Sequence, residues 1–174
     1  MELKVSKPIL IFSILAVLFS GGCSVIKVQM EEYIGKTYNC AASVVDERPD
    51  KRIIFSGLYA LAGADAIDVV PPLGDIISSK ICQNKKVNQY LASGKGLQIH
   101  IEDVKTEFIA YAFSVEYIMY VIGYLEENNQ NINIRSYGNI KSGSLRKAMP
   151  ELINNATDDF VLKIEEHLKL SELN

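Results

Sequence analysis

Cysteine, histidine and tyrosine are the residues of this chain whose side chains offer the widest chemistry. A cysteine sulfur can be acylated, oxidised to a disulfide or bound to a metal ion. The candidates are Cys23, Cys40, Cys82, His100 and His167. They lie far apart in the sequence, whereas a metal site draws several ligands at regular, short spacings. Their spacing therefore predicts no metal site.

Cys23 stands behind a characteristic leader. Lys4 and Lys7 precede an apolar run from Ile9 to Phe19, and small residues separate that run from the cysteine. These are the parts of a secretory signal. The run of about eleven residues is roughly half of what spans a bilayer, so a short uncleaved membrane anchor is the alternative interpretation. The arrangement resembles a bacterial lipoprotein signal, which implies removal of residues 1–22 and attachment of lipid, such as palmitate, to Cys23.

The residues beside Cys23 refine this resemblance. Ser20 stands where such signals usually carry a branched apolar residue, which is a departure from the pattern, whereas Gly21 and Gly22 fit it. Ser24 follows the cysteine in place of aspartate, which by resemblance implies the outer membrane in preference to the inner one. We therefore expect a lipid-anchored protein of the cell envelope that faces the periplasm, with residues 23–36 as a tether.

Cys40 and Cys82 remain as an even pair. Exported proteins meet an oxidising compartment, which favours a disulfide between them. The alternative is two buried free thiols, because cysteine packs as a small apolar residue.

Composition limits the classes of function. The chain of 174 residues has a formal net charge of −3 at pH 7, and it lacks the clustered basic surface that nucleic-acid binding requires. Residues 37–174 have the size of one domain. No nucleic-acid partner and no cofactor are predicted.

Alternation of apolar and polar residues predicts strands, and spacing of three and four predicts helices. The predicted strands cover Thr37–Val45, Leu97 toward Phe113, Ser114–Glu126 and Ile132–Lys141, and the predicted helices run from Asp75 to about Ala92 and from Met149 to Leu168. Residues 127–131 are typical of a hairpin turn. The order β-α-β-β-β-α predicts an α+β fold, with an antiparallel or mixed sheet of about four strands and two helices on one face.

The apolar segment 53–70, rich in glycine and alanine, permits two interpretations. It could contact a membrane or a partner lipoprotein, or it could be a buried connection that begins with a short strand, Ile53 to Phe55.

The element order from Gly96 to Leu170 resembles the YajG-type family of periplasmic lipoproteins and the related auxiliary lipoproteins of some ABC transport systems. The matching features are Leu97-Gln98-Ile99-His100-Ile101, a tyrosine-rich strand from Ser114 to Leu125, an Asn-rich hairpin, Ile134-Arg135-Ser136-Tyr137-Gly138 and a final amphipathic helix. Asp46 and Arg48 are similar to an Asp-x-Arg motif at the end of the first strand. The resemblance implies no catalytic residues.

Five tyrosines are the candidate interaction residues. If residues 111–124 formed one continuous strand, Tyr111 and Tyr117 would share one face and Tyr120 and Tyr124 the other. One face should be covered by helices, and the other, together with Tyr137, would expose an aromatic patch that marks an interaction surface. Ordinary cross-strand pairing is the alternative.

Two further clusters have simpler interpretations. His100 alternates with apolar neighbours and is expected on the polar face of its strand as an exposed structural residue. Asp46, Glu47, Arg48 and Asp50 are expected to form a solvated turn with a weak ion pair, with partner binding as the alternative.

These observations predict a lipid-anchored, non-enzymatic binding module with an envelope protein as partner. The alternative is an accessory lipoprotein of a lipid or solute transport system, with a small apolar ligand pocket that Tyr117, Tyr120 or Phe113 would line.

Overall fold

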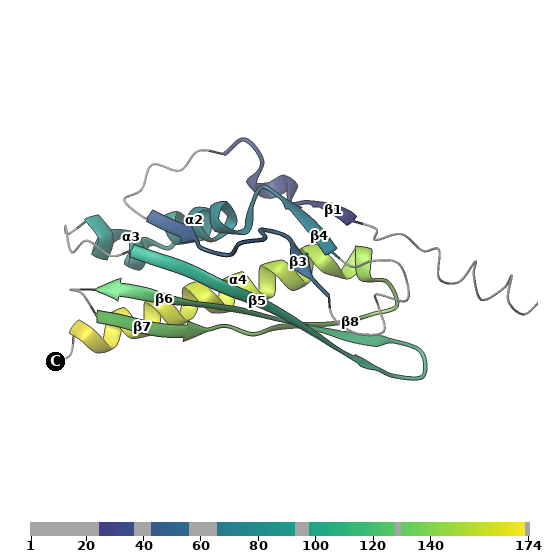
Figure 1. Ribbon diagram of the computed structural model, residues 1–174. Helices are drawn as coiled ribbons and strands as arrows, with labels where there is room; N and C mark the ends of the chain where they lie inside the picture. Colours follow the sequence, from purple (N-terminus) through teal and green to yellow (C-terminus); the bar gives the residue numbers. More distant parts are fainter. Residues whose placement is uncertain (1–24, 37–42, 56–65, 93–97, 128–129, 173–174) are drawn as a thin grey trace, which may run out of the picture.

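The computed structural model describes residues 25–36, 43–55, 66–92, 98–127 and 130–172. The predicted signal segment 1–22, the predicted lipid attachment site Cys23 and Cys40 of the predicted disulfide lie outside these residues. Figure 1 shows two sheets and the helices that pack against them.

The described elements have the following bounds. The strands are β1 Val25–Gln29, β2 Ser43–Asp46, β3 Ile53–Ile54, β4 Ala66–Val70, β5 Gln98–Ala110, β6 Val115–Glu127, β7 Gln130–Arg135 and β8 Gly138–Ser142. The helices are α2 Leu73–Gln83, α3 Lys85–Ala92 and α4 Leu145–Glu172, with a short 3-10 helix η1 at Glu31–Tyr33.

The larger sheet has five strands in the order β2-β5-β6-β7, and β8 pairs with β6 as well. β2 is parallel to β5, whereas β5, β7 and β8 are antiparallel to β6. The predicted α+β class with a mixed sheet is thus confirmed. The number of strands is larger than the predicted four, because the predicted strand 132–141 divides into β7 and β8 and because a second sheet is present.

β5 and β6 form a long hairpin whose register shifts between Ile101 and Asp103. The strands do not run on through residues 111–114, because a turn closes there with the Tyr111 amide donating to the Ser114 carbonyl at 2.8 Å. The assignment of Tyr111 and Tyr117 to one face assumed a continuous strand, and that assumption was wrong. The turn holds no glycine or proline, so its composition did not reveal it.

The second sheet has the order β1-β4-β3, with β1 parallel to β4 and β3 antiparallel to it. The prediction of a tether over residues 23–36 was wrong for residues 25–33, which form β1 and η1. Val28, Met30 and Tyr33 are buried in the core. A parallel partner some forty residues away, Ala66 opposite Val25, leaves no local turn signal in the sequence.

The described parts of segment 53–70 contribute several side chains to the buried core. Ile53 in β3 and Ile67 in β4 are fully buried, and Phe55 and Val69 are buried beside them. For these residues the buried interpretation holds, and the predicted short strand at Ile53 is confirmed as β3. Residues 56–65 lie outside the described part of the chain.

The predicted helix from Asp75 to Ala92 is two helices. α2 begins at Leu73, so Asp75 lies inside its first turn instead of capping it. The break falls at Asn84, whose side-chain oxygen accepts hydrogen bonds from the backbone amides of Lys86 and Val87 at 3.1 and 3.3 Å. Asn84 thereby caps the amino end of α3, as asparagine does at helix starts.

α4 begins four residues earlier than predicted and lies along the larger sheet (Figure 1). Its apolar side, which includes Leu152, Ile153 and Phe160, shares one core with α2 and with β6. Gly138 permits the close approach of β8, because a Cβ there would lie 2.5 Å from the Ala156 backbone nitrogen.

Candidate functional site

The two faces of the five-stranded sheet differ in what covers them. Successive residues of a strand point to opposite faces, and Tyr117, Met119, Val121 and Leu125 of β6 lie in the core shared with α2 and α4. The opposite face, here called the outer face, carries no helix within the described residues (Figure 1). It presents the side chains of Val45, His100, Glu116, Tyr120, Tyr124, Tyr137, Asn139 and Lys141.

At one end of the outer face His100 lies under Tyr124. The two residues are direct cross-strand partners, and their rings stack at 4.4 Å with an interplanar angle of 5°. The His100 Nδ1 atom is 2.8 Å from Glu47 Oε1, and the Tyr124 hydroxyl donates to the same oxygen at 3.2 Å. Burial and the Glu47 carboxylate raise the pKa of Tyr124.

The expectation that His100 is exposed was wrong, because the Tyr124 ring leaves it only 8% exposed. Its Nε2 atom is 3.7 Å from Glu126 Oε2 and has no hydrogen-bond partner in the described structure. The arrangement joins β2, β5 and β6 through side chains. It pairs one histidine with two carboxylates.

The middle of the outer face is an aromatic and cationic cluster. The rings of Tyr120 and Tyr137 lie 5.6 Å apart, and the Arg135 guanidinium lies 4.4 Å from the centre of the Tyr120 ring. A cation over an aromatic face is attracted by the electron-rich ring. The Tyr137 backbone amide donates to Asp159 of α4 at 2.7 Å. Tyr137 is therefore held in place although its side chain is 43% exposed.

At the other end, Tyr111 is fixed against Glu116. The Tyr111 hydroxyl and the Asn139 amide donate to the two oxygens of Glu116 at 2.9 and 2.8 Å, and Lys141 Nζ lies 4.9 Å from the Tyr111 ring centre. The hydrogen bonds from Asn139 and Tyr111 lower the pKa of Glu116, and the Glu116 carboxylate raises the pKa of Tyr111. Phe113, at the tip of the hairpin, is 99% exposed.

Four of the five candidate tyrosines lie on the outer face or its hairpin, and the fifth does not. Tyr117 is fully buried in the core and offers no surface to a partner. His100 and Tyr124 pair across strands, whereas Tyr111 and Tyr137 are exposed, so the interaction surface stays a prediction. Tyr117, Tyr120 and Phe113 lie in the core, on the outer face and at the tip, so they do not line one common pocket.

The predicted solvated turn at Asp46–Asp50 is partly buried, which corrects the expectation. Arg48 is 4% exposed. Its Nε and Nη2 atoms donate to the two oxygens of Asp46 at 2.9 and 2.7 Å, and Nη2 also donates to the Lys51 carbonyl. Burial by itself raises the pKa of Asp46, but the Arg48 guanidinium outweighs this effect and lowers it. Arg48 therefore organises the loop that carries Glu47.

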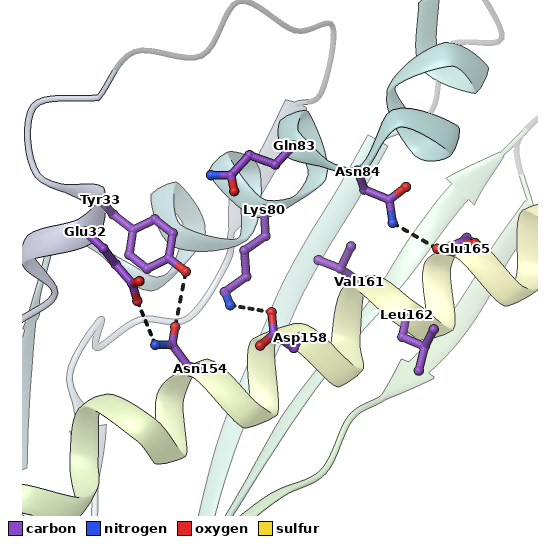
Figure 2. Close-up of a pocket in the computed structure, with 10 residues that line it drawn as sticks. All are labelled: Glu32, Tyr33, Lys80, Gln83, Asn84, Asn154, Asp158, Val161, Leu162 and Glu165. Atoms are coloured by element: carbon purple, nitrogen blue, oxygen red, sulfur yellow. Dashed lines mark hydrogen bonds and ion pairs between the residues drawn. The ribbon is translucent and has the colours of Figure 1, made fainter.

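A separate polar groove of about 550 Å³ lies between η1, α2 and α4 (Figure 2). The residues that line it are Glu32, Tyr33, Lys80, Gln83, Asn84, Asn154, Asp158, Val161, Leu162 and Glu165. This groove was not predicted, because two of its lining residues, Glu32 and Tyr33, lie in the segment that was expected to be a tether. The polar spacing of Asn154, Asp158 and Glu165 along one helix was the available signal.

The polar groups of the groove bind one another. Asn154 accepts a hydrogen bond from the Tyr33 hydroxyl at 3.2 Å and donates one to Glu32 at 2.7 Å. Lys80 pairs with Asp158, and Glu165 accepts hydrogen bonds from Asn84 and Lys86. Burial raises the pKa of Tyr33, against the lowering effect of Lys80. These contacts hold α4 against η1 and α2, so the polar residues of the groove stabilise the packing of the helices.

Cys82 lies on α2. Because Cys40 lies outside the described residues, the Cys40–Cys82 pairing stays a prediction, which non-reducing peptide mapping would test. Over the ranges that the structure describes, no three His, Cys, Asp or Glu side chains are placed to hold a metal ion, and none of the helices is long and apolar enough to cross a membrane.

No protein-family model matches the chain, and neither does any curated protein. The resemblance to YajG-type lipoproteins therefore stays a prediction from the sequence.

Proposed function

We propose that this protein is a lipid-anchored protein of the bacterial cell envelope that faces the periplasm and binds a protein partner through its outer face, without catalysing a reaction. The observation that carries the proposal is the uncovered outer face. Apart from the tip of the β5–β6 hairpin, its exposed apolar side chains are Val45 and Tyr137. Two cations contact its rings: Arg135 lies over Tyr120, beside Tyr137, and Lys141 lies over Tyr111.

This composition suits protein recognition. Tyrosine and arginine are enriched at the energetic centres of protein interfaces. Binding costs less when the contacting side chains are already held in one conformation. Asp159 fixes the backbone of Tyr137, and the Tyr120 ring contacts both the Tyr137 ring and the Arg135 guanidinium.

The anchor rests on the sequence around Cys23. Each buried methylene of an acyl chain adds about 0.8 kcal/mol of membrane affinity, so several chains on one cysteine give lasting attachment. Intact-mass analysis of the purified protein should show acyl groups and loss of residues 1–22. Cys23→Ser should lack the acyl mass. Wild-type protein without acyl mass would end the anchor proposal.

The partner surface is tested by photo-crosslinking in the cells that produce the protein. A photoreactive phenylalanine analogue in place of Tyr137 should give a discrete adduct with an envelope protein. The matched control is Leu162 on α4, whose side chain is 48% exposed and so equally accessible. No adduct at Tyr137, or the same adduct at both positions, would contradict recognition through the outer face.

A further inference from the structure

The tip of the β5–β6 hairpin is the most exposed apolar surface of the described structure. Phe113 is 99% exposed, and Ile109 and Tyr111 are 46% and 47% exposed. The run from Phe108 to Val115 contains no charged residue. Apolar side chains grouped in this way on a soluble surface mark a site of contact with a protein or a membrane.

The polar groups around the tip are compatible with a lipid surface. The Glu116 carboxylate, the nearest acid with a described contact to the tip, accepts hydrogen bonds from Tyr111 and Asn139. Lys141 lies over the Tyr111 ring. A tyrosine with a neighbouring lysine is typical of the headgroup level of a bilayer, where the ring is half buried and the ammonium group reaches water.

The position of the tip favours a bilayer over a protein as its partner. β1 begins at Val25, only two residues after Cys23. Two residues span at most about 7 Å, so a lipid on Cys23 would hold the start of β1 at the membrane surface. In Figure 1 the start of β1 and the hairpin tip lie toward the same end of the molecule, opposite the carboxyl end of α4.

We propose that the hairpin tip, residues 109–114, is a second membrane contact that inserts Phe113 into the bilayer to which Cys23 is anchored. This inference rests on the proposed lipid anchor. The lipid supplies the attachment, and the tip fixes the orientation of the domain. With two contacts at one end, the domain stands on the membrane and keeps its outer face open to the periplasm.

The chain contains no tryptophan, so one introduced tryptophan reports its own surroundings. Phe113→Trp in the lipidated protein, reconstituted in phosphatidylcholine vesicles, should show blue-shifted emission that brominated acyl chains quench. Leu162→Trp on α4 is the control, with a similar exposed fraction to Ile109 and Tyr111 but no place at the tip. Its emission should be unquenched.

A second pair of variants tests whether the introduced tryptophan at position 113 itself causes the membrane contact. Tyr111→Trp should also be quenched, and adding Phe113→Asp should abolish that quenching, because an aspartate is expelled from the bilayer. Both changes lie at an exposed tip and should leave the fold intact.

Failure of the membrane contact and failure of the lipid anchor give different results. If the Phe113→Trp variant is acylated and vesicle-bound but its emission is unquenched, the membrane contact is overturned and the anchor stands. Protein without acyl mass overturns the anchor. A blue shift without quenching that grows with protein concentration assigns the tip to a second copy of the chain, and it also overturns the membrane contact.

Discussion

The inner and outer faces of the five-stranded sheet carry side chains of the same strands but have different surroundings. On β6, Tyr117 is fully buried against the helices, whereas Tyr120 and Tyr124 lie on the opposite side among charged residues. The inner face joins the helices in one core. On the outer face, the tyrosine rings contact histidine, arginine and other tyrosine side chains.

Residue type alone therefore does not determine the role of a residue in this chain. Tyrosine serves as core on one side and as candidate recognition surface on the other. The inner face should therefore govern stability, and the outer face should govern binding.

The largest expected effect is on the inner face. Tyr117→Ala removes a fully buried ring and should lower the free energy of unfolding by about 3–5 kcal/mol. Tyr137→Ala on the outer face should cost less than about 1 kcal/mol. Urea unfolding of the two variants measures the contrast, and equal losses would erase the distinction between the faces.

A smaller effect is expected where β8 meets α4. Gly138→Ala would place a Cβ 2.5 Å from the Ala156 backbone nitrogen, so β8 or α4 must shift. Overpacking of this kind costs about 1–3 kcal/mol. Gly143→Ala is the matched control, because nothing lies within 4 Å of its added Cβ. Thermal unfolding of both should show a loss for Gly138→Ala alone.

The smallest expected effect is on the pH dependence of stability. It is tested by comparing the carboxylates of Asp46 and Glu116. Arg48 lowers the pKa of Asp46, and hydrogen bonds lower that of Glu116 on the outer face. A lowered pKa stabilises the fold above the unfolded value, near pH ~4, and that contribution disappears as the pH falls through the folded pKa. Asp46→Asn and Glu116→Gln should therefore weaken the fold at neutral pH and lose their effect in acid.

Asp46 should show the larger difference, because it forms an ion pair with the buried Arg48 guanidinium, whereas Glu116 accepts its hydrogen bonds from the neutral groups of Tyr111 and Asn139. Urea unfolding across a pH series checks this. A larger effect at Glu116 would place the stronger electrostatic contribution on the outer face.

The sequence predicted what local periodicity encodes. The repeat in α4 and the alternation in β5 and β6 depend on neighbours a few residues away, and these elements were found. β1 was missed because its partner β4 is distant and parallel, which requires no turn. The split at Asn84 depends on one side chain that bonds two amides, which periodicity does not reveal.

The candidate site divides in the same way. The exposure of Tyr137 was one of two interpretations that the strand pattern left open. The burial of Tyr117 was not predictable, because the turn at 111–114 and the register of the hairpin decide which parity faces the helices. The burial of His100 required Tyr124 directly opposite, which is a property of register and not of either residue.

The parallel pairing of β1 with β4 has a mechanical consequence. A pull on the chain ahead of Val25 acts along the axis of β1, and the ladder from Val25–Ala66 to Gln29–Val70 lies across that direction. Such a load is shared by the hydrogen bonds of the ladder together instead of opening them one after another. β1 therefore transmits tension from the amino end directly into the core, where Val28 and Met30 resist sliding.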